Sequence, residues 1–313
     1  MTLHLEPELF SQLIILTSRY RNIPESAVRR DYWIVYMFMQ LSKSDYMDKV
    51  VFKGGTSLSK CYPNSIDRFS EDIDLTFNTD ENLTSRQYEQ HLKLIEKIMT
   101  NGLLVEKIKA ERNERNKSSY VWFNDVNDKV KFEIGSSVRP DPFGYKKIKS
   151  YIQEYLEFIG NTEAIRDYGL KEVSIQVLHI SRTFIDKLFA IKRHTLGGTI
   201  KNKIRHIYDV TKIYNLDEIQ EFLSNKSQLK QIISLTKATD TYYLEKRSKS
   251  TGNYNSLEPY NFKQWKELLH KDELKNSYES LHIDLLYTND KQLYECALNT
   301  LEVIGQLFTE IDE

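Results

Sequence analysis

Two aspartates separated by one residue, Asp72 and Asp74, form the pair best suited to bind a metal ion. Ile73 and Leu75 alternate with them, which is the period of a half-buried strand, so both carboxylates are expected on one strand face. Two like charges side by side repel each other, and a divalent cation relieves that repulsion. Mg²⁺ bound by one or two carboxylates together with substrate phosphates fits the pair. The alternative is an ordinary solvated strand edge.

A glycine-rich turn formed by Gly54, Gly55, Thr56 and Ser57 follows a short apolar run at residues 50–52. Glycines after a strand let the backbone approach a ligand closely. The N–H groups that begin the next helix, together with the two hydroxyls, can hold phosphate oxygens. The segment is neither a Walker A motif nor a Rossmann fingerprint. The alternative is a plain glycine turn whose following helix is capped by Thr56 or Ser57.

Glu133 is the residue predicted to provide a third carboxylate for the metal site. It lies in the alternating run 130–134, which predicts a strand with Glu133 on its polar face. Asp125 and Asp128 are alternatives. They lie in a segment rich in Asn and Asp, where turn formation explains them better.

Two charged residues of the C-terminal half, Lys187 and Asp209, are further candidates. Lys187 lies in a helical pattern at residues 180–194, with small and apolar residues three and four positions away. Such neighbours allow its ammonium to point into a cleft and neutralise a triphosphate, whereas the alternative is a solvated lysine at the helix rim. Asp209 has Arg205 four residues before it, so the alternative for Asp209 is a weak surface ion pair.

The hydrophobic pattern predicts an α+β fold, in which a small mixed sheet is followed by helices. Strands are predicted at residues 50–52, 73–77, 103–108, 120–123, 130–134 and 173–177, and helices at 24–40, 92–98 and through the C-terminal half. Residues 139–144 are predicted to form a loop or hinge. We expect an α+β lobe at residues 1–145 and a mainly helical lobe at 146–313, which contributes Lys187 and Asp209 to a cleft.

The composition excludes several classes of protein. Of 313 residues, 40% are hydrophobic and 28% are charged, which is typical of a folded protein and excludes full disorder. The longest apolar run, residues 32–39, is far shorter than the roughly 20 residues of a membrane helix, and no leader is recognised, so a cytoplasmic protein without membrane contact is expected. Cys61 and Cys296 support neither a disulfide framework nor a thiolate metal site.

The near-neutral net charge of −1 conceals an uneven distribution. Residues 181–212 contain eight Lys or Arg against two Asp or Glu, and residues 267–313 contain three against eleven. A basic stretch inside a neutral chain predicts a phosphate-bearing ligand on one face. The alternative is a solvated, lysine-rich helix face.

Four separate blocks, which occur in this order along the chain, carry a resemblance to a known family. They are Phe52-Lys53-Gly54-Gly55-Thr56-Ser57-Leu58, Arg68-Phe69-Ser70-Glu71-Asp72-Ile73-Asp74-Leu75, Arg182-Thr183-Phe184-Ile185-Asp186-Lys187-Leu188 and Arg205-His206-Ile207-Tyr208-Asp209. The chain resembles the nucleotidyltransferase superfamily and, more closely, the AbiEii/AbiGii toxin family, which includes the MenT toxins.

The resemblance implies a nucleotidyltransferase-like sheet lobe and a metal-dependent transferase. An acceptor hydroxyl would attack the α-phosphorus of an NTP and release pyrophosphate. Asp72 and Asp74 would hold Mg²⁺ or Mn²⁺, Lys187 and the residues of the glycine-rich turn would position the NTP, and Glu133 or Asp209 would complete the metal site or act as the base.

The resemblance also implies a toxin of a type IV toxin–antitoxin system, active in abortive infection and phage defence, with a cognate antitoxin as partner. The expected acceptor is RNA, in particular the 3′ acceptor end of tRNA, with the basic stretch as its docking face. One alternative is a small hydroxylated acceptor, as in antibiotic-modifying relatives of the superfamily. Another is a non-catalytic nucleotide-binding module with a protein partner.

Overall fold

The chain forms two compact units. The computed structural model describes residues 1–70, 72–125, 128–137, 139–246, 253–284, 286, 288 and 291–312. Unit 1 consists of Met1–Cys61 and Phe69–Leu178, and unit 2 consists of Tyr62–Arg68 and His179–Glu313. The chain therefore passes between the units three times, after residues 61, 68 and 178.

Unit 1 is built on a seven-stranded mixed sheet with the strand order β3-β4-β5-β2-β1-β7-β6. The strands are β1 (Val50–Lys53), β2 (Asp72–Phe77), β3 (Leu104–Lys107), β4 (Asn116–Trp122), β5 (Val130–Gly135), β6 (Phe143–Ile148) and β7 (Val173–Leu178). The pairs β1–β7 and β2–β5 are parallel, and the other pairs are antiparallel. The predicted α+β class with a mixed sheet is confirmed.

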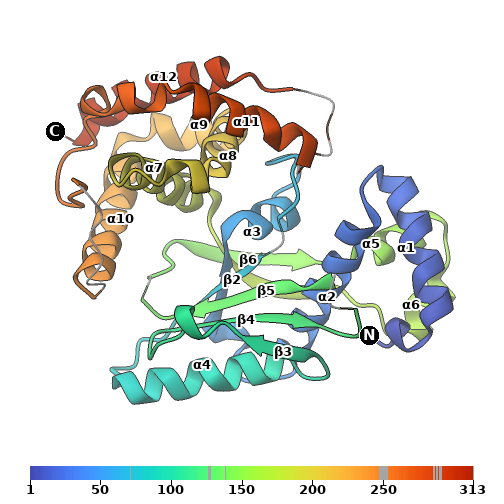
Figure 1. Cartoon of the computed structure of the whole chain (residues 1–313). Coiled ribbons are helices and arrows are strands. Elements are labelled where there is room, and N and C mark those ends of the chain that lie inside the picture. The colour runs from blue at the N-terminus through green and yellow to red at the C-terminus, as the bar shows by residue number, and fades with distance from the viewer. Residues whose placement is uncertain are drawn as a thin grey trace. The chain divides into compact units, whose positions relative to one another are not determined.

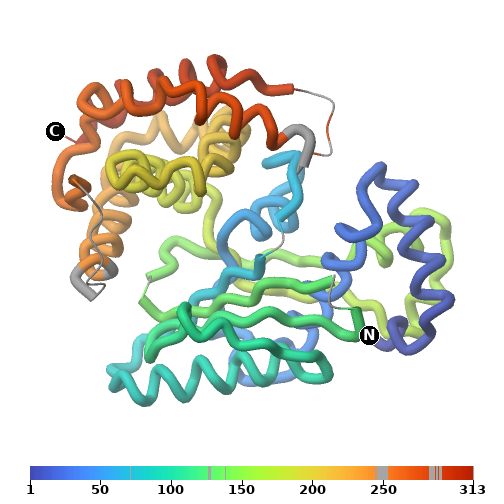
Figure 2. The backbone as a smooth tube through the Cα atoms, in the orientation of Figure 1, coloured from blue at the N-terminus to red at the C-terminus, as the bar shows by residue number. Residues whose placement is uncertain are grey.

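Six α-helices accompany this sheet in the described part of unit 1. They are α1 (Pro7–Arg21), α2 (Glu25–Leu41), α3 (Gly54–Cys61), α4 (Ser85–Met99), α5 (Tyr151–Phe158) and α6 (Thr162–Asp167). Within unit 1, α4 lies along one face of the sheet and α3 lies on the other (Figure 1). Although far apart in sequence, α1 and α5 lie side by side (Figure 2).

The alternation of side chains gives the central strands one apolar and one polar face. On β2, Ile73 and Leu75 are buried, whereas Asp72 and Asp74 are half-buried. On β5, Val130, Phe132 and Ile134 are fully buried, and the residues between them are half-buried. Because successive strand residues point to opposite faces, the polar face predicted from the sequence is confirmed for both strands.

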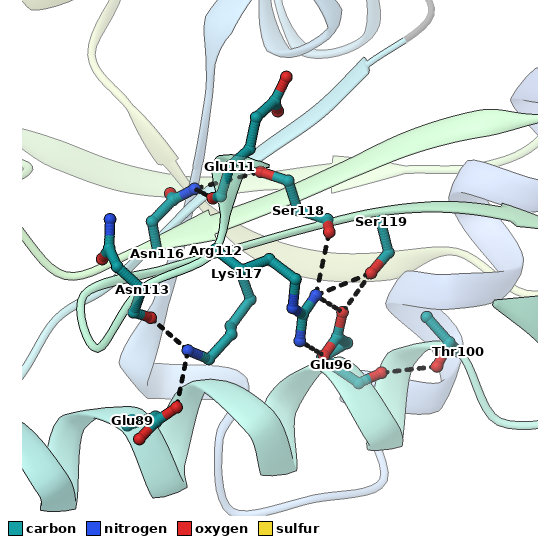
Figure 3. A network of polar contacts seen from close by, with 10 residues as sticks. All are labelled: Glu89, Glu96, Thr100, Glu111, Arg112, Asn113, Asn116, Lys117, Ser118 and Ser119. Carbon is teal, nitrogen blue, oxygen red and sulfur yellow. Dashed lines mark hydrogen bonds and ion pairs between the residues drawn. The ribbon is translucent and has the colours of Figure 1, made fainter. Parts of the chain in front are cut away.

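A network of buried polar groups joins the sheet to α4 (Figure 3). The Glu96 carboxylate accepts two hydrogen bonds from the Arg112 guanidinium, at 2.6 and 2.7 Å, and one from the Ser119 hydroxyl. Burial alone would raise the pKa of Glu96, but the bonds from Arg112 and Ser119 outweigh it and lower that pKa. Lys117 and Ser119 both lie on β4, and Lys117 donates to Glu89 of α4. Lys117 and Ser119 therefore point toward α4.

Unit 2 is helical in its described part. Its α-helices are α7 (Ile180–Leu196), α8 (Arg205–Tyr214), α9 (Asp217–Ser224), α10 (Lys226–Lys246), α11 (Asp272–Asp284) and α12 (Tyr294–Asp312). Aromatic side chains form much of its core: the Tyr260 ring lies 5.4 Å from Trp265 and 5.2 Å from Phe308, centroid to centroid. None of the described helices of either unit has the length and apolar character needed to cross a membrane.

Two features of the fold differ from the sequence-based expectation. The segment expected to be a loop at residues 139–144 runs into β6, an edge strand that begins at Phe143, just after a cis peptide bond between Asp141 and Pro142. The division between the units falls after Leu178 rather than after residue 145, because β6 and β7 complete the sheet of unit 1.

Candidate active site

The glycine-rich turn lies directly against one of the predicted metal ligands. Gly54 has a left-handed backbone, with φ +84°, and its Cα faces the Asp74 side chain. A Cβ at this position would overlap the Asp74 carboxylate and lie only 3.0 Å from its Cγ. The register explains the approach, since Lys53 on β1 pairs with Asp74 on β2. Only glycine allows both the backbone turn and this contact.

The two hydroxyls of the turn take part in its internal hydrogen bonds. Thr56 Oγ1 donates to the carbonyl oxygen of Asp72, and Ser57 Oγ donates to the carbonyl oxygen of Gly54 at 2.9 Å. Both side chains are buried. Thr56 therefore joins α3 to β2, and Ser57 bonds within the turn. The backbone at Gly54 and Gly55 is thus the better candidate to contact phosphate oxygens.

A polar row crosses the parallel pair of strands β2 and β5. Asp72 pairs with Lys131, and Asp74 pairs with Glu133. The Lys131 ammonium forms ion pairs with Glu133 and, at 2.8 Å, with Glu111. Burial disfavours the charged form of Lys131, but the bonds to the two glutamates outweigh that effect and raise its pKa.

The donor set on β2 fits a divalent metal ion. Carboxylate oxygens are the ligands that Mg²⁺ prefers, and one or two of them suffice when substrate phosphates and water complete the shell. Asp72 and Asp74 provide such oxygens on a half-buried face. Glu133 is already neutralised by Lys131, and no group of three carboxylate, histidine or cysteine side chains within the described ranges is arranged to hold a metal. A third ligand at Glu133 therefore stays a prediction.

A cluster of buried charges lies in unit 2 around Asp209. Arg68 contacts both oxygens of this carboxylate, from Nε to Oδ1 at 2.6 Å and from Nη2 to Oδ2 at 2.7 Å. Lys187 Nζ lies 2.8 Å from Oδ2. Asp209 is fully buried and the Lys187 side chain is 7% exposed. The solvated lysine and the surface pair with Arg205, considered as alternatives from the sequence, are therefore both excluded.

This environment makes Asp209 a poor proton acceptor. Burial alone would raise the pKa of Asp209, but the charges and hydrogen bonds of Arg68 and Lys187 outweigh it and hold that pKa well below the ordinary range. A general base needs a pKa near the working pH. The contacts thus favour Asp209 as a positioning residue for Arg68 and Lys187 over the predicted base.

His206 extends the cluster, since its Nδ1 lies 3.5 Å from Lys187 Nζ. Burial and the nearby Lys187 charge lower the pKa of His206 well below its ordinary value, so the ring is neutral at physiological pH. A neutral Nδ1 accepts a hydrogen bond from the ammonium. The Lys187 ammonium is therefore oriented from two sides, by a carboxylate and by an imidazole.

The predicted site residues thus fall into two groups, one in each unit. Unit 1 contains the turn with Asp72, Asp74 and Glu133, and unit 2 contains Lys187 and Asp209. Sequence reasoning missed the roles of Arg68 and His206. Both residues belong to the blocks that carry the family resemblance, and their place in those blocks was the one sequence feature that could have marked them as site residues.

The basic stretch at residues 181–212 is only partly exposed. Arg182, Lys187 and Lys192 are buried in unit 2. Arg193 pairs with Asp240 at 2.7 Å. Part of this positive charge is therefore held inside the unit, whereas Lys201 and Lys203 are exposed, and a docking face for RNA stays a prediction.

Replacement of Gly54 by alanine is expected to destabilise the protein by more than about 2 kcal/mol. The left-handed backbone costs a residue with a Cβ roughly 1–3 kcal/mol, and the overlap with the Asp74 carboxylate adds to this cost. Urea unfolding measures the change in the free energy of unfolding.

Two glycines of unit 1 provide matched controls for that variant. Gly160 also has a positive φ, +74°, but a Cβ there meets no heavy atom within 4 Å, so Gly160→Ala measures backbone strain alone. Gly144 has neither feature, so Gly144→Ala is expected to be nearly neutral. If Gly54→Ala were no more destabilising than Gly160→Ala, the close contact with Asp74 would be disproved.

Asp209→Asn is expected to lower the free energy of unfolding by about 3 kcal/mol, because it leaves two buried cations without their carboxylate. The folded-state pKa of Asp209 is depressed, so its contribution is complete above the unfolded pKa of about 3.9 and is lost as the pH falls below it. The difference between wild type and variant should therefore shrink below about pH 4.

Asp67→Asn is the control, since Asp67 forms a partly exposed pair with Lys212 at 2.7 Å in the same unit. Its expected cost is at most about 1 kcal/mol. Equal effects of the two substitutions would contradict a special role for the Asp209 cluster.

The Helicobacter pylori protein JHP933 is similar in structure, with 17% sequence identity over 92% of this chain and 93% of JHP933, and a TM-score of 0.44. MenT4, a nucleotidyltransferase toxin from Mycobacterium tuberculosis, has 16% identity over 93% of this chain and 98% of MenT4, with a TM-score of 0.49. No curated protein matches the chain.

The family is established by sequence. The profile described as "Nucleotidyl transferase AbiEii toxin, Type IV TA system" matches residues 36–295, which include the turn, both aspartates of β2 and the Asp209 cluster. The chain therefore belongs to the AbiEii family of type IV toxin–antitoxin systems and is a nucleotidyltransferase toxin.

Proposed function

We propose that this toxin is a metal-dependent enzyme that transfers a nucleoside monophosphate from an NTP to an RNA hydroxyl, with the 3′ acceptor end of tRNA as the favoured target. The observation that carries the proposal is the contact between Gly54 and the Asp74 carboxylate. It brings a backbone suited to bind phosphate next to a carboxylate suited to bind metal, both within unit 1.

Each group has a distinct role in the proposed reaction. Asp72 and Asp74 hold Mg²⁺ or Mn²⁺, which supplies neutralising charge to the phosphates when bound. The backbone at Gly54 and Gly55 orients the triphosphate. Lys187 neutralises phosphate charge, and Asp209 and His206 orient its ammonium. Glu133 is proposed as a further metal ligand. In that role its carboxylate gives up the ion pair with Lys131 and binds the metal ion instead.

The biological setting follows from the family. A cognate antitoxin is the proposed protein partner, and modification of tRNA in the cytoplasm during phage infection is the proposed outcome. An RNA acceptor is proposed ahead of a small hydroxylated molecule because it is the acceptor that the resemblance of the four blocks to the AbiEii/AbiGii family implies.

The decisive experiment incubates the purified protein with each labelled NTP and total RNA in the presence of Mg²⁺ or Mn²⁺. Label in tRNA supports the proposal. Label found only in small molecules would assign another acceptor, and unreacted nucleotide that stays bound would indicate a non-catalytic module. Either of the last two results would contradict transfer to RNA.

Asp72→Ala and Asp74→Ala are each expected to abolish transfer and toxicity, because each removes one of the two carboxylates proposed to position the metal ion against the substrate phosphates. Without metal, the thermal midpoint should be unchanged or raised, since the substitution removes one of two like charges. Transfer assays and metal-free thermal melting test both expectations. A fully active variant would refute the assignment of the metal site.

Lys187→Ala is expected to weaken NTP binding or to slow transfer, and Lys187→Arg to restore it only in part, because a planar guanidinium does not replace a compact ammonium. The matched control is Lys192→Met. Lys192 is also buried on α7, but it donates to the carbonyl oxygen of Pro259 at 2.6 Å. If both substitutions reduced transfer equally, the loss would reflect folding rather than phosphate binding.

A further inference from the structure

Two aromatic side chains lie on the polar face of β4. Lys117 and Ser119 point toward α4, as Figure 3 shows, and successive strand residues alternate between faces. Tyr120 and Trp122 therefore lie on the opposite face from α4. Tyr120 is 37% exposed and Trp122 is half-buried. These two rings are referred to below as the aromatic pair.

A lysine next to the aromatic pair adds positive charge. Lys129 Nζ lies 4.7 Å from the centroid of the Trp122 ring and 5.4 Å from that of Tyr120. Its ion pair is with Glu106 at 2.6 Å, and the Glu106 side chain is largely exposed. An exposed pair is weak, so a phosphate can replace this carboxylate at little cost.

The strand register connects the aromatic pair to the candidate metal ligands. Asp72 pairs with Lys131 across β2 and β5, and Lys131 pairs with Tyr120 across β5 and β4. Two strand spacings put the backbone of Tyr120 about 10 Å from that of Asp72. That distance is comparable with the length of one nucleotide. An RNA molecule whose reacting hydroxyl lies at Asp72 can therefore place one of its bases over the aromatic pair.

The order of the strands indicates whether a base on the aromatic pair belongs to the NTP or to the RNA acceptor. The glycine-rich turn follows β1, on one side of β2, whereas β5 and β4 lie on the other side. In an in-line displacement, the attacking oxygen and the leaving oxygen lie on opposite sides of the phosphorus. With the triphosphate at the turn, the acceptor approaches from the side of β5 and β4.

We infer that Tyr120 and Trp122 bind an unpaired base of the RNA acceptor by stacking, with Lys129 close to the RNA backbone. Aromatic side chains on an open sheet face stack single-stranded bases in several RNA-binding proteins, and a lysine beside them contacts phosphate. This inference rests on the proposed function, because it takes RNA as the acceptor and the turn as the triphosphate site.

Tryptophan fluorescence can test the inference independently of catalysis. The chain has three tryptophans, and Trp33 and Trp265 are buried, with 3% and 1% exposure. Quenching by a solute therefore reports mainly on Trp122. An unstructured RNA hexamer, titrated into the Asp72→Ala protein so that no turnover occurs, is expected to quench this fluorescence. The quenching should be lost in the same protein with Trp122→Phe.

Alanine substitutions then test the contribution of each ring to acceptor binding. In the otherwise wild-type enzyme, Tyr120→Ala and Trp122→Ala are each expected to raise the KM for RNA about 5-fold to 150-fold, which corresponds to the loss of one stacked base. The affinity for NTP should be unchanged. Trp122→Phe, which keeps a ring, is expected to retain most of the affinity for RNA and shows that the alanine effect is not a folding defect.

Tyr145 on β6, at the opposite edge of the sheet and 58% exposed, provides a matched control. Tyr145→Ala is expected to leave the KM for RNA unchanged. An equal rise in KM for Tyr145→Ala would overturn the assignment of the binding surface.

The outcomes distinguish failure of the inference from failure of the proposed function. Quenching by the RNA hexamer without any transfer to RNA would support the aromatic pair and contradict the proposed reaction. Transfer to RNA with an unchanged KM in both alanine variants would overturn the aromatic pair alone. Quenching by NTP without RNA would assign the rings to the incoming nucleotide and would also overturn the inference.

Discussion

The missing side chain at Gly54 is the constraint on which the candidate site of unit 1 depends. Because no Cβ is present, the chain can turn from β1 into α3 with a positive φ while the Asp74 carboxylate lies against the turn. Thr56 then joins α3 to the first residue of β2 through the Asp72 carbonyl. The position of both aspartates thus follows from the turn, and the parallel register with β5 places the rest of the polar face relative to them.

Burial gives the charges of unit 2 a different function from those of unit 1. Asp72 and Asp74 lie on a half-buried strand face, where solvent and a cation can reach a side chain. Asp209 is fully buried, and two cations share its oxygens. A buried carboxylate with such partners stays ionised and holds its neighbours in place, because removing any member leaves an uncompensated charge. The same residue type is therefore proposed to bind metal in one environment and to position basic side chains in the other.

The sequence predicted the strand faces that short-range periodicity determines. It did not predict contacts and burial that depend on residues far away in the chain. Alternation on β2 and β5 predicted their polar faces, but not the register that places Asp74 beside Glu133. The strand β6 has four consecutive exposed residues, so it lacks the alternation that reveals a strand. The pairing of Arg68 with Asp209 joins residues 141 positions apart, and no local pattern indicates such a contact.

The partial burial of the basic stretch bears on the proposed recognition of RNA. A count of charges does not distinguish a lysine on the surface from one such as Lys192, whose ammonium lies inside unit 2. A net charge of −1 also means that no overall positive field draws RNA to the protein, so attraction to phosphates rests on local cations such as Lys129. The proposed recognition of RNA would then draw also on contacts that need no net charge. Stacking of a base on Tyr120 and Trp122 is such a contact, since every base has an aromatic face.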